Sequence, residues 1–166
     1  MYHLHAHWRM EYVAAPKDSK GGADTFSCMY GENNDEENLI LHRGPHTFII
    51  MNKYPYNAGH LLVLPNRQVA QLEDLSCEER TEIMERIMHA KAILSQALNP
   101  HGFNVGFNLG HSGGAGIPEH LHAHVVPRWD GDTNFMPVLN ETRVLPVSLQ
   151  TLFKRMKPFV ESTDTV

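Results

Sequence analysis

The chain contains 166 residues, enough for one domain with an ordinary hydrophobic core. Hydrophobic residues make up 42% and charged residues 20%, as in a soluble globular protein, and the formal net charge of −5 argues against a binder of duplex DNA. Two cysteines provide no disulfide framework, and no apolar run approaches the ~20 residues of a membrane span. We therefore expect a cytoplasmic protein with neither a nucleic-acid nor a membrane partner.

The first part of the chain carries weak structural signals. We predict a partly ordered N-terminal arm over residues 1–37 and a single domain over residues 38–166. Within the arm and just beyond it, Pro16–Asn38 is polar and rich in Gly, Asn and Asp, which is typical of a loop.

Two short apolar runs follow, at His46–Asn52 and His60–Pro65. The segment between them, Lys53–Gly59, contains Pro, Asn and Gly, which favour turns. The pattern predicts an antiparallel hairpin with a long connecting loop.

The segment Ser76–Leu98 has the clearest helical pattern in the chain. Ser76 and Glu79 match a capping box, in which each side chain bonds the other residue's backbone N–H. Apolar residues recur at three- and four-residue spacing and form one stripe, which predicts a helix with one buried face. The stripe consists of Ile83, Ile87, Ala90, Leu94 and Ala97.

The last third of the chain contains two further predicted strands. Phe103–Asn108 alternates as a strand should, Leu109–Glu119 is a glycine-rich loop, and His120–Pro127 is predicted to be a strand that ends at its proline. A short helix over Ser148–Phe159, limited by Pro158, closes the fold. Paired strands with separate helices indicate the α+β class.

The pentapeptide HLHAH occurs twice, at His3–His7 and at His120–His124. The first copy has no apolar flank and no glycine loop, so we interpret it as a histidine-rich terminal segment. In the second copy, strand alternation places His120, His122 and His124 on one face, with same-face residues ~7 Å apart. A loop whose backbone N–H groups can approach an anion precedes it.

Three interpretations remain open for such a row of histidines. The first is a purely structural role, with the histidines half-buried. The second is a metal site, because histidine is the commonest metal ligand. A cupin-type metal site needs a carboxylate three or four residues after its H-x-H, whereas Val125, Val126 and Pro127 follow here. The third is nucleophilic catalysis at phosphorus, for which a neutral imidazole is well suited.

The second copy with its flanks, HLHAHVV, resembles the histidine triad (HIT) family pattern, in which histidines alternate with apolar residues. Phe48–Arg67 is similar to the first hairpin of that family, and Phe103–Trp129 to its active-site half. Trp8–Val13 and Asp130–Phe135 resemble the branch that contains diadenosine tetraphosphate phosphorylases and related hydrolases. The resemblance implies an antiparallel sheet of about five strands, a long central helix, a C-terminal helix and a homodimer.

The resemblance also implies a mechanism. His122 would attack the α-phosphorus of a nucleotide and form a covalent nucleotidyl-histidine intermediate. His124 would contact the phosphate or the leaving oxygen, and His120 would orient the row. The implied substrate contacts are Asn52, Asn108, Gly114, Ala115, Gly116, Arg128 and Trp129. His60 aligns with a family histidine near the site.

One departure from the family concerns zinc. Many bacterial and archaeal members bind a structural zinc through a C-x-x-C motif and two histidines. Here Cys28 is followed by Gly31 in place of the second cysteine, and Gln68 stands where a histidine is expected. We therefore expect no structural zinc, no metal site and no required cofactor, although Mg²⁺ can accompany a polyphosphate substrate.

We predict a nucleotidyl hydrolase or transferase that cleaves the α-phosphate linkage of dinucleoside polyphosphates or related nucleoside phosphates. The alternative is a purine-nucleotide-binding interaction module with only slow hydrolysis, because such modules keep the same three histidines.

Overall fold

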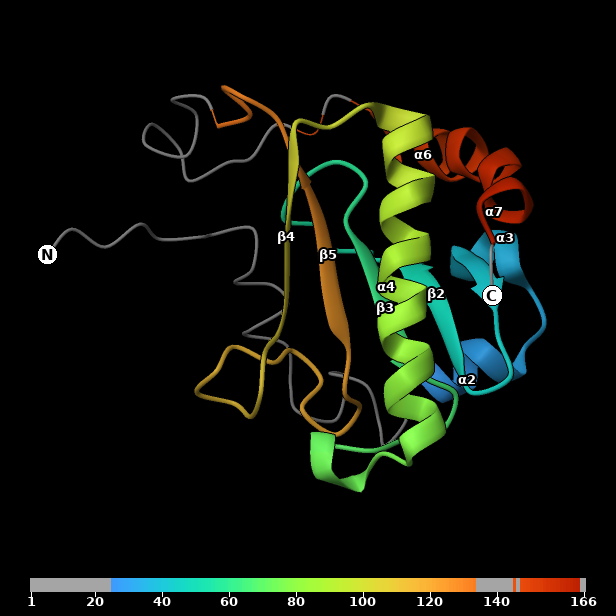
Figure 1. The fold of residues 1–166 in the computed structure, drawn as a ribbon, viewed down its shortest axis with the longest axis vertical. Coiled ribbons are helices and arrows are strands. Elements are labelled where there is room, and N and C mark those ends of the chain that lie inside the picture. Colours follow the sequence, from blue (N-terminus) through green and yellow to red (C-terminus); the bar gives the residue numbers. More distant parts are fainter. Residues whose placement is uncertain (1–24, 134–144, 146, 165–166) are drawn as a thin grey trace, which may run out of the picture.

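The computed structural model describes residues 25–133, 145 and 147–164 (Figure 1). Its centre is a five-stranded antiparallel sheet with the strand order β1-β2-β3-β5-β4. The strands are β1 (Ile40–Arg43), β2 (Thr47–Met51), β3 (Leu61–Pro65), β4 (Gly102–Phe107) and β5 (Ala123–Arg128). The predicted hairpin is confirmed, because β2 pairs with β3 along its whole length. The expected α+β class and the five strands are confirmed as well.

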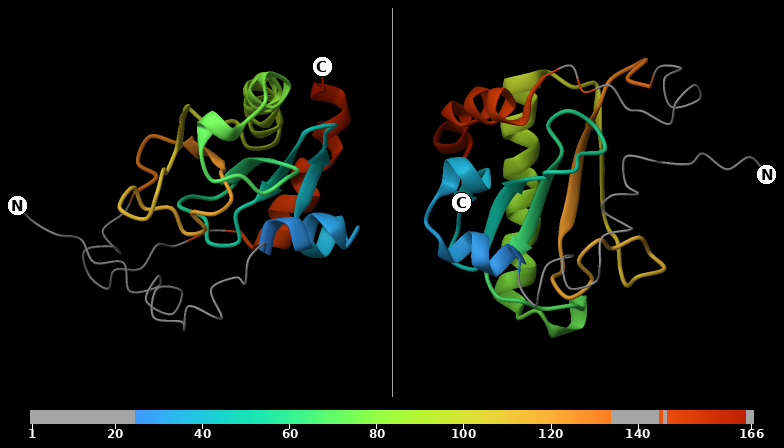
Figure 2. Two further views of the ribbon diagram at one scale, coloured as in Figure 1. Left: turned by 90° about the horizontal axis from the view of Figure 1, so that it is seen from below. Right: turned by 180° about the vertical axis from the view of Figure 1, so that it is seen from behind.

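The long helix α4 (Cys77–Leu98) covers one face of this sheet (Figures 1 and 2). It begins at the predicted capping box, in which Glu79 N–H donates to Ser76 Oγ at 3.2 Å and Ser76 N–H donates to a Glu79 carboxylate oxygen at 2.7 Å. All five residues of the predicted stripe are buried, so the sequence pattern identified the packed face correctly.

The sheet has a separate apolar cluster on each face. Strand β2 is buried throughout, and its side chains alternate between the two clusters. Ile49 and Met51 pack under α4, whereas Phe48 and Ile50 pack on the opposite face with Phe26. Because β2 contributes to both clusters, it reads as a continuous apolar run rather than as an alternating one.

Several elements differ from the predictions. Helices α2 (Thr25–Gly31) and α3 (Asp35–Asn38) occupy part of the segment predicted to be a loop, which is therefore wrong for these residues. Helix α2 lies on the sheet face opposite α4 (Figure 2). Strand β1 was not predicted.

The C-terminal segment forms two helices instead of the single predicted one. They are α6 (Leu149–Met156) and α7 (Pro158–Thr163), and they pack beside α4. Pro158 occupies the first turn of α7, where its missing N–H costs nothing. A short 3₁₀ turn, η3 (Leu72–Asp74), precedes α4. No helix in the described part of the chain combines the length and the apolar character needed to cross a membrane.

Substitution of Ile93 tests the packing of α4 on the sheet. Ile93 is fully buried in the α4-side cluster, so Ile93→Ala should lower the free energy of unfolding by about 3 kcal/mol, from lost burial and the cavity left behind. Met84 on the same helix is 58% exposed, and Met84→Ala should change it by less than about 0.5 kcal/mol. Urea denaturation of both variants measures the difference, and equal losses would contradict the assigned face.

Candidate active site

The three histidines of the second HLHAH copy lie together on one face of the sheet. Their exposed fractions are 0% for His120 and 7% for both His122 and His124. The intervening Leu121 and Ala123 pack into the α4-side cluster, as the predicted alternation requires. The strand itself begins only at Ala123, so His120 and His122 lie on the segment that leads into β5.

His122 is held in one tautomer by a backbone carbonyl. Its Nδ1 lies 2.7 Å from the carbonyl oxygen of His120, and a carbonyl oxygen can only accept. Nδ1 therefore carries the proton, and Nε2 has a free electron pair. Burial lowers the pKa of His122 below its ordinary value of 6.5, outweighing the opposite effect of the carbonyl. His122 is thus a neutral imidazole with a nucleophilic Nε2 near pH 7.

His120 is anchored rather than presented to solvent. Its Nε2 donates to the carbonyl oxygen of Pro65 at 2.9 Å, which ties it to the end of β3. The ring of Phe26, from α2, meets the ring of His120 edge-on at 5.5 Å between centroids and lies 5.7 Å from that of His122. Phe26 is a residue that sequence reasoning missed, because α2 lies in a segment with a loop-like composition.

A fourth histidine, His60, lies beside the triad and contacts His124. His60 is 1% exposed, and its Nε2 lies 3.0 Å from Nδ1 of His124. The backbone N–H of Tyr56 donates to Nδ1 of His60 at 3.1 Å. Since an amide N–H can only donate, His60 must carry its proton on Nε2 and donate it to His124. A neutral His124 then carries its own proton on Nε2.

The pKa of His60 is consistent with this arrangement. Burial is the largest cause of a decrease from 6.5 to about 3, and the neighbouring His124 and His122 lower it further. His60 is therefore neutral at any physiological pH, so its tautomer is set by hydrogen bonds alone.

The two predicted asparagines lie beside these histidines. Asn52 Nδ2 is 3.3 Å from Nδ1 of His60. Asn108 Nδ2 is 3.4 Å from the hydroxyl of Tyr56 and 3.4 Å from the carbonyl oxygen of Gly114. The structure thus joins Asn52 to His60 and Asn108 to Tyr56, while the contacts of both asparagines with a substrate stay a prediction.

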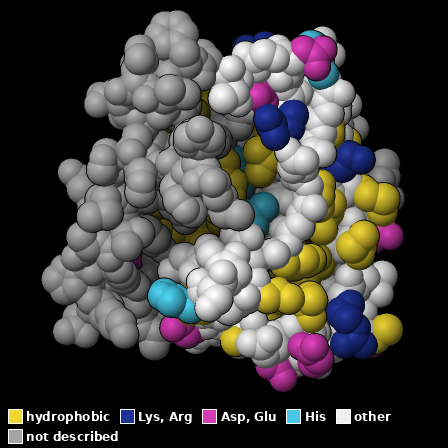
Figure 3. All heavy atoms as spheres, turned by 90° about the vertical axis from the view of Figure 1, so that its left-hand side faces the viewer, with side chains coloured by type: hydrophobic (Ala, Val, Ile, Leu, Met, Phe, Trp, Pro, Cys, Tyr) yellow, Lys and Arg dark blue, Asp and Glu magenta, His cyan; other side chains and the backbone are white. Residues whose placement is uncertain are grey.

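The glycine-rich loop between β4 and β5 is tightly folded on itself. A side chain at Gly113 would collide with the carbonyl of Leu109, and Gly114 adopts a positive φ of 88°. The backbone N–H groups of Gly114 and Ala115 donate within the loop, to His111 and Gly110. Contacts of Gly114, Ala115 and Gly116 with a phosphate therefore stay a prediction, and the first two would have to exchange bonds. Figure 3 shows histidine surface in a hollow on this side of the molecule.

Arg128 and Trp129 lie at the other end of β5. Arg128 lies four positions beyond His124 along the strand, about 13 Å away. The guanidinium of Arg128 contacts both oxygens of Asp132, at 2.6 and 3.0 Å, and its hydrogen bond is the main cause of the lowered pKa of Asp132. Trp129 Nε1 donates to the carbonyl of Asn99. The structure does not bring these two residues to the triad; their role as substrate contacts stays a prediction and requires a ligand that extends along β5.

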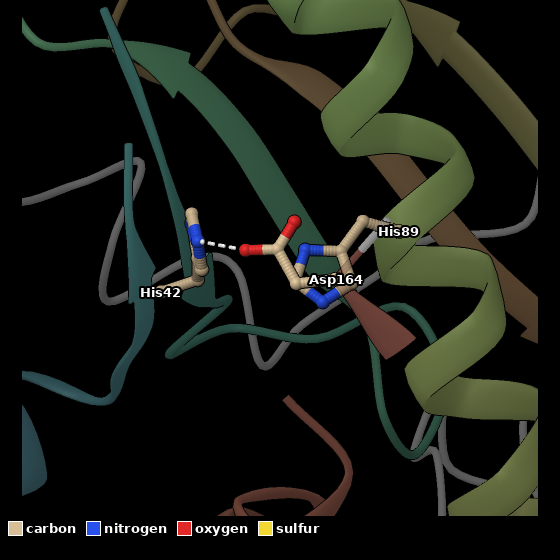
Figure 4. A group of neighbouring side chains, drawn as sticks. All are labelled: His42, His89 and Asp164. Carbon is tan, nitrogen blue, oxygen red and sulfur yellow. Dashed lines mark hydrogen bonds and ion pairs between the residues drawn. The ribbon is translucent and has the colours of Figure 1, made fainter. Parts of the chain in front are cut away.

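Among the described residues, one group of three has ligand atoms close enough for a metal ion: His42, His89 and Asp164 (Figure 4). Asp164 accepts from His42 Nε2 at 3.0 Å and from the guanidinium of Arg86 at 2.6 Å. Arg86 also lies 3.3 Å from Nδ1 of His89.

A cation at this group would therefore meet a buried positive charge. The group is better described as an ion-pair network that joins β1, α4 and the end of α7. Cys28 does not belong to it and is exposed, and the expected absence of structural zinc stays a prediction.

Some residues that carried the family resemblance lie outside the described residues. These are the hexapeptide Trp8–Val13 and the last two residues of Asp130–Phe135. The first HLHAH copy, interpreted as a histidine-rich terminal segment, also lies outside them. The boundary between arm and domain at residue 37 likewise stays a prediction.

Comparison with known proteins gives a consistent picture. A family model for the HIT domain matches residues 33–131. AP-4-A phosphorylase of Mycobacterium tuberculosis is 42% identical over 149 residues, which cover 86% of this chain and 76% of that protein. The asymmetrical bis(5'-nucleosyl)-tetraphosphatase of Schizosaccharomyces pombe is 28% identical over 93 residues, 56% of this chain and 50% of that protein.

Two solved structures share the fold. A hypothetical histidine triad nucleotide-binding protein from Sulfolobus tokodaii superposes with a TM-score of 0.68 at 22% identity, covering 83% of this chain and 92% of the other. A zinc-bound histidine triad family protein from Mycobacterium smegmatis gives 0.67 at 19% identity, covering 87% and 99%.

The low pKa of His60 makes stability depend on pH. The unfolded chain takes up a proton at this position below about pH 6.5, whereas the folded chain does so only near pH 3. The contribution of the neutral His60 to the free energy of unfolding is therefore complete above pH 6.5 and is lost as the pH falls toward 3. Between pH 7.5 and pH 5, the free energy of unfolding of the wild type should fall about 2 kcal/mol more than that of His60→Asn. Urea denaturation at both pH values measures this.

The exposed His111 provides the matched control. His111→Asn should lose as much stability as the wild type over the same pH interval. If His60→Asn also follows the wild type, His60 is not the buried neutral group described here.

Proposed function

This chain belongs to the HIT domain family, and from that premise we propose that it is a nucleotidyl hydrolase or transferase acting on dinucleoside polyphosphates. The observation that carries the proposal is the state of His122, whose Nδ1 is bound by a carbonyl and whose Nε2 keeps its electron pair. The similarity to a mycobacterial AP-4-A phosphorylase over most of the chain supports diadenosine tetraphosphate as the first substrate to test.

The first chemical step forms a bond from His122 Nε2 to the α-phosphorus. The bond between that phosphorus and the bridging oxygen breaks, and the nucleoside polyphosphate leaves with the electron pair. Nδ1 of the nucleotidyl-histidine keeps its proton, and the resulting positive charge faces the carbonyl oxygen of His120 at 2.7 Å. The carbonyl thus stabilises the intermediate electrostatically.

His124 acts in this step as a hydrogen-bond donor. Its Nε2–H can bond an oxygen of the phosphate or of the leaving group, which carries the developing negative charge. Protonation of His124 on Nδ1 would be unfavourable, because its N–H would then face the N–H of His60, with the two nitrogens 3.0 Å apart. Because a polyphosphate leaves as a stable anion, donation of a hydrogen bond suffices and no full proton transfer is required.

The second step depends on the acceptor. Water or inorganic phosphate attacks the same phosphorus, the bond to His122 Nε2 breaks with its electron pair returning to Nε2, and the imidazole is neutral again. When water attacks, its proton passes to the solvent. With water, diadenosine tetraphosphate gives ATP and AMP; with phosphate it gives ATP and ADP. The relative that is a phosphorylase favours phosphate. Mg²⁺ enters, in this proposal, with the polyphosphate and not as a resident cofactor.

We also propose a homodimer. Strand β4 is one of the two edge strands of the described sheet, and Val105 on it is 47% exposed. An unpaired edge with an exposed apolar residue suits pairing with a second copy. Light scattering after size-exclusion chromatography measures the mass directly, and a mass of one chain at micromolar concentration would refute the dimer.

The intermediate provides the most direct test of the reaction. Acid quenching of the enzyme with diadenosine tetraphosphate should add one adenylyl group to the peptide that contains His122, as seen by mass spectrometry. His122→Ala should lose this adduct and several orders of magnitude of activity, because no other group replaces the nucleophile. The product formed with and without phosphate identifies the acceptor.

The same experiment separates the enzyme from the binding module. Tight AMP binding by the wild type, without an adduct and without turnover, would assign the chain to the module class. Turnover that survives His122→Ala would refute the covalent mechanism.

A further inference from the structure

Tyr56 lies in the loop between β2 and β3 and contacts three parts of the site. Its backbone N–H bonds His60, its ring lies against both His60 and His124, and its hydroxyl is 3.4 Å from Asn108. We propose that the ring of Tyr56 is a positioning element that holds His124 with its Nε2–H directed to the substrate. This proposal rests on the proposed function and names a further residue needed for it.

The stacking geometry supports the proposal. The ring planes of Tyr56 and His124 differ by only 16°, with centroids 5.5 Å apart. On His60 the same ring lies at 4.7 Å and 38°. Rotation of the imidazole about its Cβ–Cγ bond would give up this near-parallel arrangement of the two rings. Rotation of His124 would break its bond with His60 and move its donor nitrogen away from the phosphate position.

On the triad side, the ring of His124 also contacts the ring of His122. The rings of His122 and His124 meet edge-on, with centroids 5.0 Å apart and planes at 64°. The nucleophile and the donor are thus adjacent, and the tyrosine ring adds the contact that fixes the plane of the donor. The ring and the hydroxyl of Tyr56 have separable roles, because the hydroxyl faces Asn108, which also bonds the glycine-rich loop at Gly114.

The inference is tested by removing the ring and the hydroxyl separately. Tyr56→Phe keeps the stacked ring, Tyr56→Leu removes it, and both keep the backbone N–H that bonds His60. Tyr54, in the same loop and 57% exposed, provides the control Tyr54→Leu. With diadenosine tetraphosphate, Tyr56→Leu should lower kcat about 100-fold with little change in KM, because misplacement of a catalytic group by about 1 Å has effects of this size. Tyr56→Phe and Tyr54→Leu should keep kcat within about threefold of the wild type.

A second readout does not depend on activity. The ¹⁵N chemical shifts of an imidazole report which nitrogen carries the proton, and comparison with His124→Asn assigns the signals of His124. The wild type should show an N–H at Nε2 and an unprotonated Nδ1 that accepts the hydrogen bond of His60. In Tyr56→Leu, measured well below its unfolding temperature, both signals should move toward the average of the two tautomers.

The outcomes distinguish this inference from the proposed function. If the wild type forms no adenylyl-histidine, the proposed function fails, and the ¹⁵N shifts still decide the role of the ring. If the wild type is active and Tyr56→Leu matches it in both kcat and ¹⁵N shifts, the positioning role is overturned. If Tyr56→Phe loses as much activity as Tyr56→Leu, the hydroxyl is the essential group and the proposal for the ring is wrong.

Discussion

The hydrogen bond from the backbone N–H of Tyr56 to Nδ1 of His60 sets the polarity of the whole site. An imidazole in isolation can place its proton on either nitrogen, but a peptide N–H can only donate. Hydrogen bonds are therefore donated in one direction, from Tyr56 to His60 and from His60 to His124. At His122 the carbonyl of His120 acts in the opposite sense, because it can only accept. Two backbone groups thus decide which nitrogen carries the proton in each of two neighbouring imidazoles, and the proposed roles of nucleophile and donor follow from that.

This arrangement needs histidines that stay neutral. Burial supplies the condition, because removal of a histidine from water disfavours its charged form and lowers its pKa, as for His60 and His122. The cost is stability in acid, where the unfolded chain gains protons that the folded chain cannot bind. The same burial that keeps His122 neutral thus makes the folded protein sensitive to low pH.

The sheet and helix α2 fix the positions of these rings. Strands β3 and β5 pair so that Leu62 is opposite His124, while Ala123 and Val125 face α4. Helix α2 covers the histidine face through Phe26. At the β1 edge of the sheet, Arg86 binds Asp164 and holds the end of α7 against α4. The charged network and the histidine row are thus built from different parts of the molecule, and a substitution in one need not disturb the other.

The sequence by itself determined what depends on local patterns. Turn residues between two apolar runs identified the β2–β3 hairpin, the capping box and the apolar stripe identified α4, and alternation placed the three histidines on one face. A motif of adjacent residues predicted His122 as the nucleophile, and that role stays a prediction. Arg128 could not be judged in this way, because a position next to the motif in sequence lies about 13 Å away along an extended strand.

Only the tertiary structure decided which distant residues meet. His60 and His124 are separated by 64 positions, and no periodicity predicts that their nitrogens lie 3.0 Å apart. Helix α2 is short and lies in a segment of loop-like composition, and its stability comes from burial against the sheet rather than from propensity. Strand β1 has only four residues, too few to show a strand pattern by themselves. The tautomers followed from the same contacts, because a proton's position on an imidazole is set by the partner that the fold brings to it.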